Sequence, residues 1–278
     1  MDDPSNGQKH AEAYRNSVEP LYGEPLYEQI GGRLPLADQG TQLVAEARCG
    51  YLPVEIRPSL DDDVRMIALD PSRAMLDLAR ERAEEAGVAN DIFFIPERVD
   101  AISYADGVFQ SSICLEGMIT GRQAQNGLDE LSRVTVDDGT IAVAFPLATS
   151  FEAFYDLLDE ALRAHEMVDR FERVEDLRET LLSPARLMAI TDCLGLDVES
   201  MERIEWSLEF ERGRDFLHAP VVRETFFPHW IGVISSPNRD QVMRYIGDAI
   251  DTYWRARTFR TSVRVAYMVV RLGGEDRG

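Results

Sequence analysis

Between residues 42 and 149 the chain alternates short apolar runs with segments of helical periodicity, and this pattern restricts the fold more than any other feature. Strands that alternate with helices are typical of a parallel sheet covered by helices. Two later extended runs, separated by about fifty residues, could pair in antiparallel fashion at the sheet edge. We therefore expect an α/β fold with a doubly wound, seven-stranded, mainly parallel sheet, an antiparallel last strand and a helical insertion before that strand. The predicted strands are 42–48, 64–70, 91–97, 108–116, 140–147, 197–211 and 261–272.

Two of the predicted helices have clear boundary signals. One follows the second strand, where Ser72 can cap the helix and Gly87 can end it. The other is predicted over 150–166, with Ser150 as its cap. Each carries an apolar stripe at helical spacing, formed by Met75, Leu78, Ala79, Ala83 and Ala86 in the first and by Phe151, Phe154, Tyr155, Leu158 and Leu162 in the second. Further helices are expected over 174–182, 184–194 and 238–256.

The length of 278 residues suits one large α/β domain with an insertion, and no linker-like boundary interrupts the chain. We expect an N-terminal segment with a lid helix over residues 1–40. The α/β domain is expected over 41–272, with the insertion at about 212–257. Within the insertion, the aromatic stretch 216–234 could form an apolar acceptor pocket or a partner surface, or it could simply pack Phe226, Phe227 and Trp230 onto the core.

Charge and composition exclude several classes of function. The chain has 50 acidic and 29 basic residues, for a net charge of −21, which disfavours binding to nucleic acid and to anionic lipid. No apolar run reaches the ~20 residues of a membrane span, and the N-terminus has no apolar signal region, so we expect a cytoplasmic protein. The three cysteines and four histidines have no metal-binding spacing, so no metal site is expected.

The carboxyl ends of the first four strands identify a candidate binding site. In a doubly wound sheet, ligands bind beyond these ends, where the strand order reverses. The turns 46–52, 97–100 and 114–118 should meet there with Asp70, which closes the second strand. A carboxylate in that place can accept hydrogen bonds from both hydroxyls of a ribose. As a ligand-binding acid, Asp70 should add little to fold stability; alternatively, Asp70, Pro71 and Ser72 form only a helix-capping turn.

Several motifs in this order resemble the class I S-adenosylmethionine-dependent methyltransferases, which have a Rossmann-like fold, over about residues 14–272. The stretch "IALDPSRAMLDLAR" matches the second strand and its helix, with Asp70 in the place of the ribose-binding acid. The stretch "YADGVFQSSICLE" is similar to the family's fourth strand, and "LDELSRVTVDDGTIAVAFP" to its next helix, turn and fifth strand. The long C-terminal strand resembles the antiparallel seventh strand of the family.

This resemblance implies a cofactor, S-adenosylmethionine, and a set of residues that bind it. In the turn after the first strand, Glu46 matches the acid that precedes the family's G-x-G-x-G motif, and Gly50 matches its second glycine. The residues that the resemblance assigns to cofactor binding are Glu46, Arg48, Gly50, Asp70, Pro71, Met75, Arg98, Val99 and Cys114. No catalytic residue is implied, because methyl transfer depends mainly on positioning the acceptor. If a base takes part, the candidates are His218, His229, Glu116 and Tyr22.

The chain departs from the family pattern around this one pocket. Arg48 and Leu52 replace two glycines of the loop, Arg98 stands where the family often has an aspartate, and Gln110 replaces an aspartate of the fourth strand. Asp137-Asp138-Gly139 stands for the Pro-Gly-Gly turn. Arg48 could pair with Glu46 and fill the site, or it could bind the cofactor's carboxylate.

Two functions remain open from the sequence. The first is a methyltransferase that acts on a small-molecule or lipid-like acceptor. The second is a catalytically inactive methyltransferase-like protein that serves as a binding or regulatory module, for which a protein partner is expected. A nicotinamide-dependent dehydrogenase is disfavoured, because no G-x-G-x-x-G follows the first strand. The N-terminal tyrosines Tyr14, Tyr22 and Tyr27 lie where the family commonly folds a lid over the cofactor.

Overall fold

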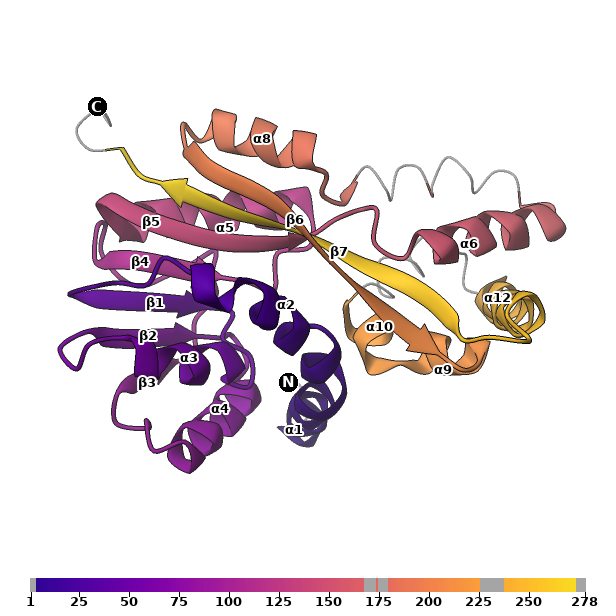
Figure 1. The fold of residues 1–278 in the computed structure, drawn as a ribbon, viewed down its shortest axis with the longest axis horizontal. Helices are drawn as coiled ribbons and strands as arrows, with labels where there is room; N and C mark the ends of the chain where they lie inside the picture. The colour runs from indigo at the N-terminus through magenta and orange to yellow at the C-terminus, as the bar shows by residue number, and fades with distance from the viewer. Residues whose placement is uncertain (1–3, 168–173, 175–179, 226–237, 274–278) are drawn as a thin grey trace.

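The core of the molecule is a seven-stranded sheet with the order β3-β2-β1-β4-β5-β7-β6, whose strands lie side by side in Figure 1. A computed structural model describes residues 4–167, 174, 180–225 and 238–273. The first five strands are parallel, and β7 runs antiparallel between β5 and β6. The predicted fold class is therefore confirmed. The strands are β1 (Thr41–Ala45), β2 (Arg65–Leu69), β3 (Ile92–Ile95), β4 (Phe109–Cys114), β5 (Thr135–Pro146), β6 (Asp197–Phe210) and β7 (Phe259–Arg271).

Strand β5 begins at Thr135, five residues earlier than the apolar pattern predicts. The extension holds the turn-like residues Asp137-Asp138-Gly139, and Asp138 has a left-handed φ of 62°. The amide of Asp138 donates to the carbonyl of Leu272 at 3.0 Å, so the far end of the chain holds this irregular stretch in the sheet.

The sheet buries both of its faces, and alternate residues of each strand serve opposite cores. Leu43 and Ala45 of β1 pack with α5 (Gly121–Val134) and α8 (Pro184–Cys193), which cover one face. Val44 lies on the other face, in the core to which Met75 of α4 (Arg73–Glu85) belongs. The short α3 (Tyr51–Ile56) and the turn η4 (Arg57–Ser59) lie on that same face.

Helix boundaries follow the sequence signals at α4 but not at α6 (Glu152–Ala164). The hydroxyl of Ser72 accepts from the amide of Met75, as predicted for a cap. Ser150 does not cap α6, contrary to the prediction; its hydroxyl donates to the carbonyl of Arg264 and accepts from its amide, both at 2.9 Å. Ser150 is therefore hydrogen-bonded to strand β7 and not to the helix that follows it.

The N-terminal segment lies over the carboxyl edge of the sheet. It consists of α1 (Pro4–Ala13), a π-helical turn η1 (Tyr14–Val18), η2 (Glu19–Leu21), α2 (Gly23–Ile30) and η3 (Gly31–Arg33). Ala11, Tyr14 and Val18 are buried in the core that α4 shares. Glu19 fixes the segment to the domain, because its carboxylate accepts from both terminal nitrogens of Arg82 on α4.

Strands β6 and β7 continue past the rest of the sheet as a long antiparallel pair and carry the insertion at their far end (Figure 1). The insertion comprises α9 (Gly213–His218), α10 (Pro220–Thr225) and α12 (Arg239–Tyr253), and α6 packs against α12. Most of the helix predicted over 174–182 lies outside the described residues. So do Phe226, Phe227, His229 and Trp230 of the aromatic stretch.

Candidate functional site

The turn that follows β1 brings three of the predicted residues to the point where the strand order reverses. Glu46 and Arg48 both have left-handed backbones, with φ of 53° and 51°, and Gly50 has φ of 80°. Only glycine adopts this region without cost, so two side chains are held here in a strained backbone. Gly50 also permits close packing, since a Cβ there would lie 2.7 Å from the Cβ of Ala79 on α4.

Asp70 is fully buried at the end of β2, and each of its carboxylate oxygens accepts one hydrogen bond. One carboxylate oxygen accepts from the amide of Arg48 at 3.0 Å, and the other accepts from the amide of Ser72 at 2.9 Å. The carboxylate thus links the β1 turn to the start of α4. The capping-turn interpretation of Asp70 describes this arrangement, which a ribose would have to replace in part.

The side chain of Arg48 lies among the carboxylates of the turn. Its Nη1 is 3.3 Å from Glu46 and 3.8 Å from Asp70, and its guanidinium lies 5.8 Å from the centre of the Tyr14 ring. Burial disfavours the charge, but the carboxylates of Glu46 and Glu116 outweigh it and raise the pKa of Arg48 above its usual value. The Nε of Arg48 is buried without a hydrogen-bond partner in the described part of the chain.

Glu116, two residues past β4, completes this cluster from the opposite side. The hydroxyl of Tyr14 donates to its carboxylate, which ties the N-terminal segment to the sheet. Burial raises the pKa of Glu116 to about 7, although Arg48 and the Tyr14 hydrogen bond oppose the shift. Burial raises the pKa of Glu46 as well, against the effect of Arg48. The site therefore holds more carboxylates than cations, and one of them titrates near neutrality.

The space left between these groups is very small. A cavity of about 20 Å³ is bounded by Glu46, Arg48 and Glu116, together with Leu26 and Tyr27 of α2. That is room for roughly one water molecule, whereas sites for cofactor-sized ligands measure roughly 300–1,000 Å³. In this conformation Arg48 and the N-terminal segment fill the place where the sequence predicts a cofactor.

The other predicted site residues differ in how far they share this site. Val99 is buried, and its amide donates a hydrogen bond to Glu46. Cys114 and Met75 are buried and flank the cluster, Cys114 through a contact with the carbonyl of Glu116 and Met75 through Cys49. Pro71 is exposed. Arg98 lies largely in solvent, where it makes a bidentate pair with Asp100 at 2.8 Å.

The candidate bases are dispersed. Glu116 lies in the site, whereas His218 is exposed on α9 of the insertion. Tyr22 is buried, with its ring edge-on to Trp206 of β6, and burial raises its pKa far above the usual value. His229 lies outside the described residues.

One contact of this site has no signal in the local sequence. Gly117 has φ of 90°, and a Cβ at this position would lie 2.7 Å from the side chain of Glu46. The turn after β4 therefore approaches Glu46 closely. A lone glycine in a turn is too common to identify such a contact from sequence.

Neither metal-binding nor membrane-spanning geometry occurs in the part of the chain that the structure describes. Within those residues, no three histidine, cysteine or acidic side chains are grouped as metal ligands. Of the described helices, none is both long and apolar enough to cross a bilayer.

Comparisons with known proteins agree with this architecture. Residues 49–139 match the family model of a methyltransferase domain. A protein of Bacillus halodurans C-125 assigned as a methyltransferase is similar in structure over 88% of this chain and 98% of its own, with a TM-score of 0.58 and 12% identity. The [4+2]-cyclase SpnF is similar over 93% and 83% of the two chains, with a TM-score of 0.55 and 11% identity.

A geranyl diphosphate C-methyltransferase from Streptomyces coelicolor A3(2) shares the fold over 90% of this chain and 78% of its own, with a TM-score of 0.51 and 13% identity. It was solved with Mg²⁺, geranyl diphosphate and S-adenosyl-L-homocysteine. At such identities the structural likeness concerns the fold, and the family model supplies the sequence relationship. The resemblance predicted from the motifs is confirmed over residues 49–139, which match a methyltransferase domain, and the chain shares the fold of the class I methyltransferases.

Proposed function

We propose that this chain is an S-adenosylmethionine-dependent methyltransferase that acts on a small-molecule acceptor. The observation that carries the proposal is the meeting of Glu46, Gly50 and Asp70 at the strand-order reversal of a class I methyltransferase fold. In such sheets this edge is the ligand site. The proposal assigns the cofactor to this edge and the acceptor to the space beside Glu116.

The charge of the site suits the cofactor, although its present space does not. Glu46, Asp70 and Glu116 surround one cation, Arg48, and a cationic sulfonium compound could take over the charge that Arg48 now supplies. The cavity of about 20 Å³ cannot admit it until Arg48 moves. Arg48 has a strained backbone and an unpaired buried Nε, and both features lower the cost of its departure.

Each residue of the sheet-edge site has a role that follows from its position. When bound, S-adenosylmethionine supplies an electrophilic methyl group. Asp70 would hold the ribose hydroxyls, and Gly50 would let the backbone come close to the ligand. Glu116, with a pKa of about 7, can accept or hold a proton at neutral pH. Tyr14 orients that carboxylate and excludes water from above the site.

A small-molecule acceptor is supported by the structural neighbours. The S. coelicolor enzyme was solved with geranyl diphosphate, a small acceptor. SpnF, a cyclase, indicates that the same architecture also hosts other reactions, so fold alone does not fix the chemistry.

One observation favours a second candidate, a methyltransferase-like module without catalysis. Arg48 is held by two carboxylates and a tyrosine ring in the place of the cofactor. If that cluster is permanent, Arg48 acts as a built-in substitute for the ligand, and the protein works through its surface.

Calorimetric titration with S-adenosylmethionine and S-adenosylhomocysteine separates these candidates. The proteins are the native chain, Arg48→Gly, and the control Arg98→Ala, which removes an exposed arginine near the same edge. We expect micromolar binding to the native chain and to Arg98→Ala, and tighter binding to Arg48→Gly, which removes the competing cation and suits φ of 51°. Binding that appears only in Arg48→Gly would establish the non-catalytic module. No binding to any of the three would overturn the cofactor assignment.

A further inference from the structure

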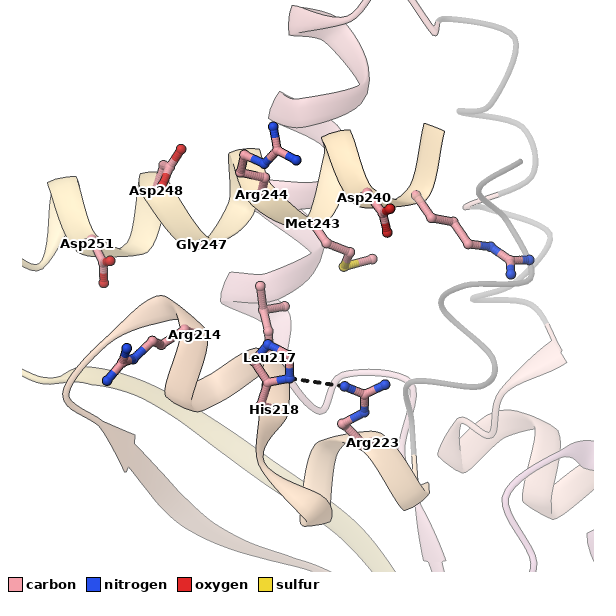
Figure 2. Close-up of a pocket in the computed structure, with 11 residues that line it drawn as sticks. Arg214, Leu217, His218, Arg223, Asp240, Met243, Arg244, Gly247, Asp248 and Asp251 are labelled. Carbon is pink, nitrogen blue, oxygen red and sulfur yellow. Dashed lines mark hydrogen bonds between the residues drawn. The ribbon is translucent and has the colours of Figure 1, made fainter. Parts of the chain in front are cut away.

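A second cavity, about 420 Å³ in volume, lies in the insertion between α9, α10 and α12 (Figure 2). It is some twentyfold larger than the cavity at the sheet edge and falls in the size range of small-molecule sites, roughly 300–1,000 Å³. We call it the insertion groove.

The groove owes its shape to a contact between two glycines. A Cβ on Gly213 of α9 would lie 2.3 Å from the carbonyl oxygen of Gly247 on α12, so the two helices touch through their backbones. The amide of Gly213 also donates to the carboxylate of Asp251 at 2.7 Å, which fixes the crossing. The groove lies beside this contact, between α12 and the two shorter helices α9 and α10 (Figure 2).

Arginine and histidine side chains line the groove from all three helices. Arg214 and His218 lie one turn apart on α9, and Arg223 comes from α10; Arg244 of α12 also lines the groove, but its guanidinium points away from His218 and Arg223 in Figure 2. All four are exposed. Within the described residues, Arg244 forms no ion pair or hydrogen bond through its side chain.

The contact between His218 and Arg223 defines the donors of this group. Nη1 of Arg223 is 3.1 Å from Nδ1 of His218. A guanidinium can only donate, so Nδ1 is the acceptor and the ring carries its proton on Nε2. This pair therefore offers further N–H donors and no free acceptor.

The charge of the insertion differs from that of the chain as a whole. Residues 212–258 contain seven arginines and five acidic residues, whereas the full chain has a net charge of −21. Asp240, Asp248 and Asp251 also line the groove, and Asp251 is engaged by Gly213. Leu217 and Met243 add an apolar surface between the charged groups.

We propose that the insertion groove binds a small molecule with a phosphate or carboxylate group on an apolar body. Arg223 binds the anion through charge-assisted hydrogen bonds, and His218 donates from Nε2. Arg244, an exposed side chain of the facing helix, turns toward the groove to complete the site. Leu217 and Met243 contact the apolar part. The inference does not rest on methyl transfer, because none of these residues belongs to the sheet-edge site.

The test uses hexyl phosphate, hexanoate and inorganic phosphate as probes, titrated calorimetrically into the full chain at fixed ionic strength. We expect one of the two hexyl probes to bind with a Kd below about 1 mM, at least about tenfold tighter than inorganic phosphate. The double variant Arg223→Gln/Arg244→Gln should weaken that binding at least about tenfold, since it removes the two guanidinium groups that bind the anion. Arg203→Gln, which changes an exposed arginine of β6, is the matched control and should bind as the native chain does.

Each result bears on the proposal. Preference for hexyl phosphate over hexanoate, or the reverse, identifies the anionic group. Equal binding of hexyl phosphate and inorganic phosphate would disprove the apolar contact. Equal losses of affinity in the double variant and in Arg203→Gln would mean that the effect comes from general surface charge. No binding of either hexyl probe would overturn the site. Because the exchanged arginines are exposed, a circular-dichroism spectrum like that of the native chain is expected for every variant.

Discussion

The sheet-edge site and the insertion groove are made of the same kinds of charged side chain, arranged in opposite ways. At the sheet edge, one arginine lies among several carboxylates, and its side chain fills the space between them. In the groove, arginines from three helices line a space about twentyfold larger. The difference indicates that charge composition alone does not identify a binding site. What matters is whether the charged groups leave space between them for a ligand.

The largest expected effect would come from breaking the sheet-edge cluster. Asp70→Ala removes the acceptor of two backbone amides and leaves Arg48 with fewer buried partners. We expect a loss of about 3 kcal/mol in the free energy of unfolding, measured by urea denaturation. This reverses the expectation from sequence alone that Asp70 matters little for stability.

Asp62→Ala, which removes an exposed aspartate just before β2, is the control and should change stability by less than about 0.5 kcal/mol. A similarly small loss in Asp70→Ala would mean that the cluster is not held as described.

A smaller effect is expected from crowding the contact between α9 and α12 beside the groove. Gly213→Ala places a methyl group against the backbone of Gly247, so α9 and α12 must separate. We expect a loss of about 2 kcal/mol in urea denaturation, as is usual for overpacked contacts. Gly32→Ala is the control, since a Cβ there meets nothing within 4 Å. Equal stability of the two variants would contradict the close crossing of the helices.

The smallest effect concerns the proton of Glu116. Burial raises its pKa from the usual 4.5 to about 7, so between these values the folded chain holds a proton that the unfolded chain has released. Stability from this group is therefore present below about pH 4.5 and is lost as the pH rises through 7. Relative to Glu116→Gln, the native chain should lose about 1 kcal/mol between pH 6 and pH 7.

Denaturation curves at the two pH values measure this difference directly. Glu81→Gln, at an exposed position on α4, should track the native chain. If the stability of Glu116→Gln has the same pH dependence as that of the native chain, Glu116 is not buried as a protonated acid. The sheet-edge site is then open to water.

The sequence was sufficient to predict the sheet, because burial on both faces leaves an apolar run in each strand and the turns between runs are polar. The sequence was less informative where a side chain has several possible hydrogen-bond or ion-pair partners. Ser150 is a residue type typical of helix caps, but its hydroxyl donates to the carbonyl of Arg264, 114 residues away. The position of Arg48 depends on Tyr14 and Glu116, which come from distant segments. The Gly213–Gly247 contact joins two different helices, so no local sequence pattern predicts it.

The chain enters and leaves the insertion at one place. Phe210, the last residue of β6, pairs directly with Phe259, the first residue of β7. A segment whose two ends are adjacent can change in length or content at little entropic cost to the rest of the molecule. The insertion between β6 and β7 can therefore be replaced or changed in length, while the seven strands, and the edge where Asp70 lies, keep their geometry.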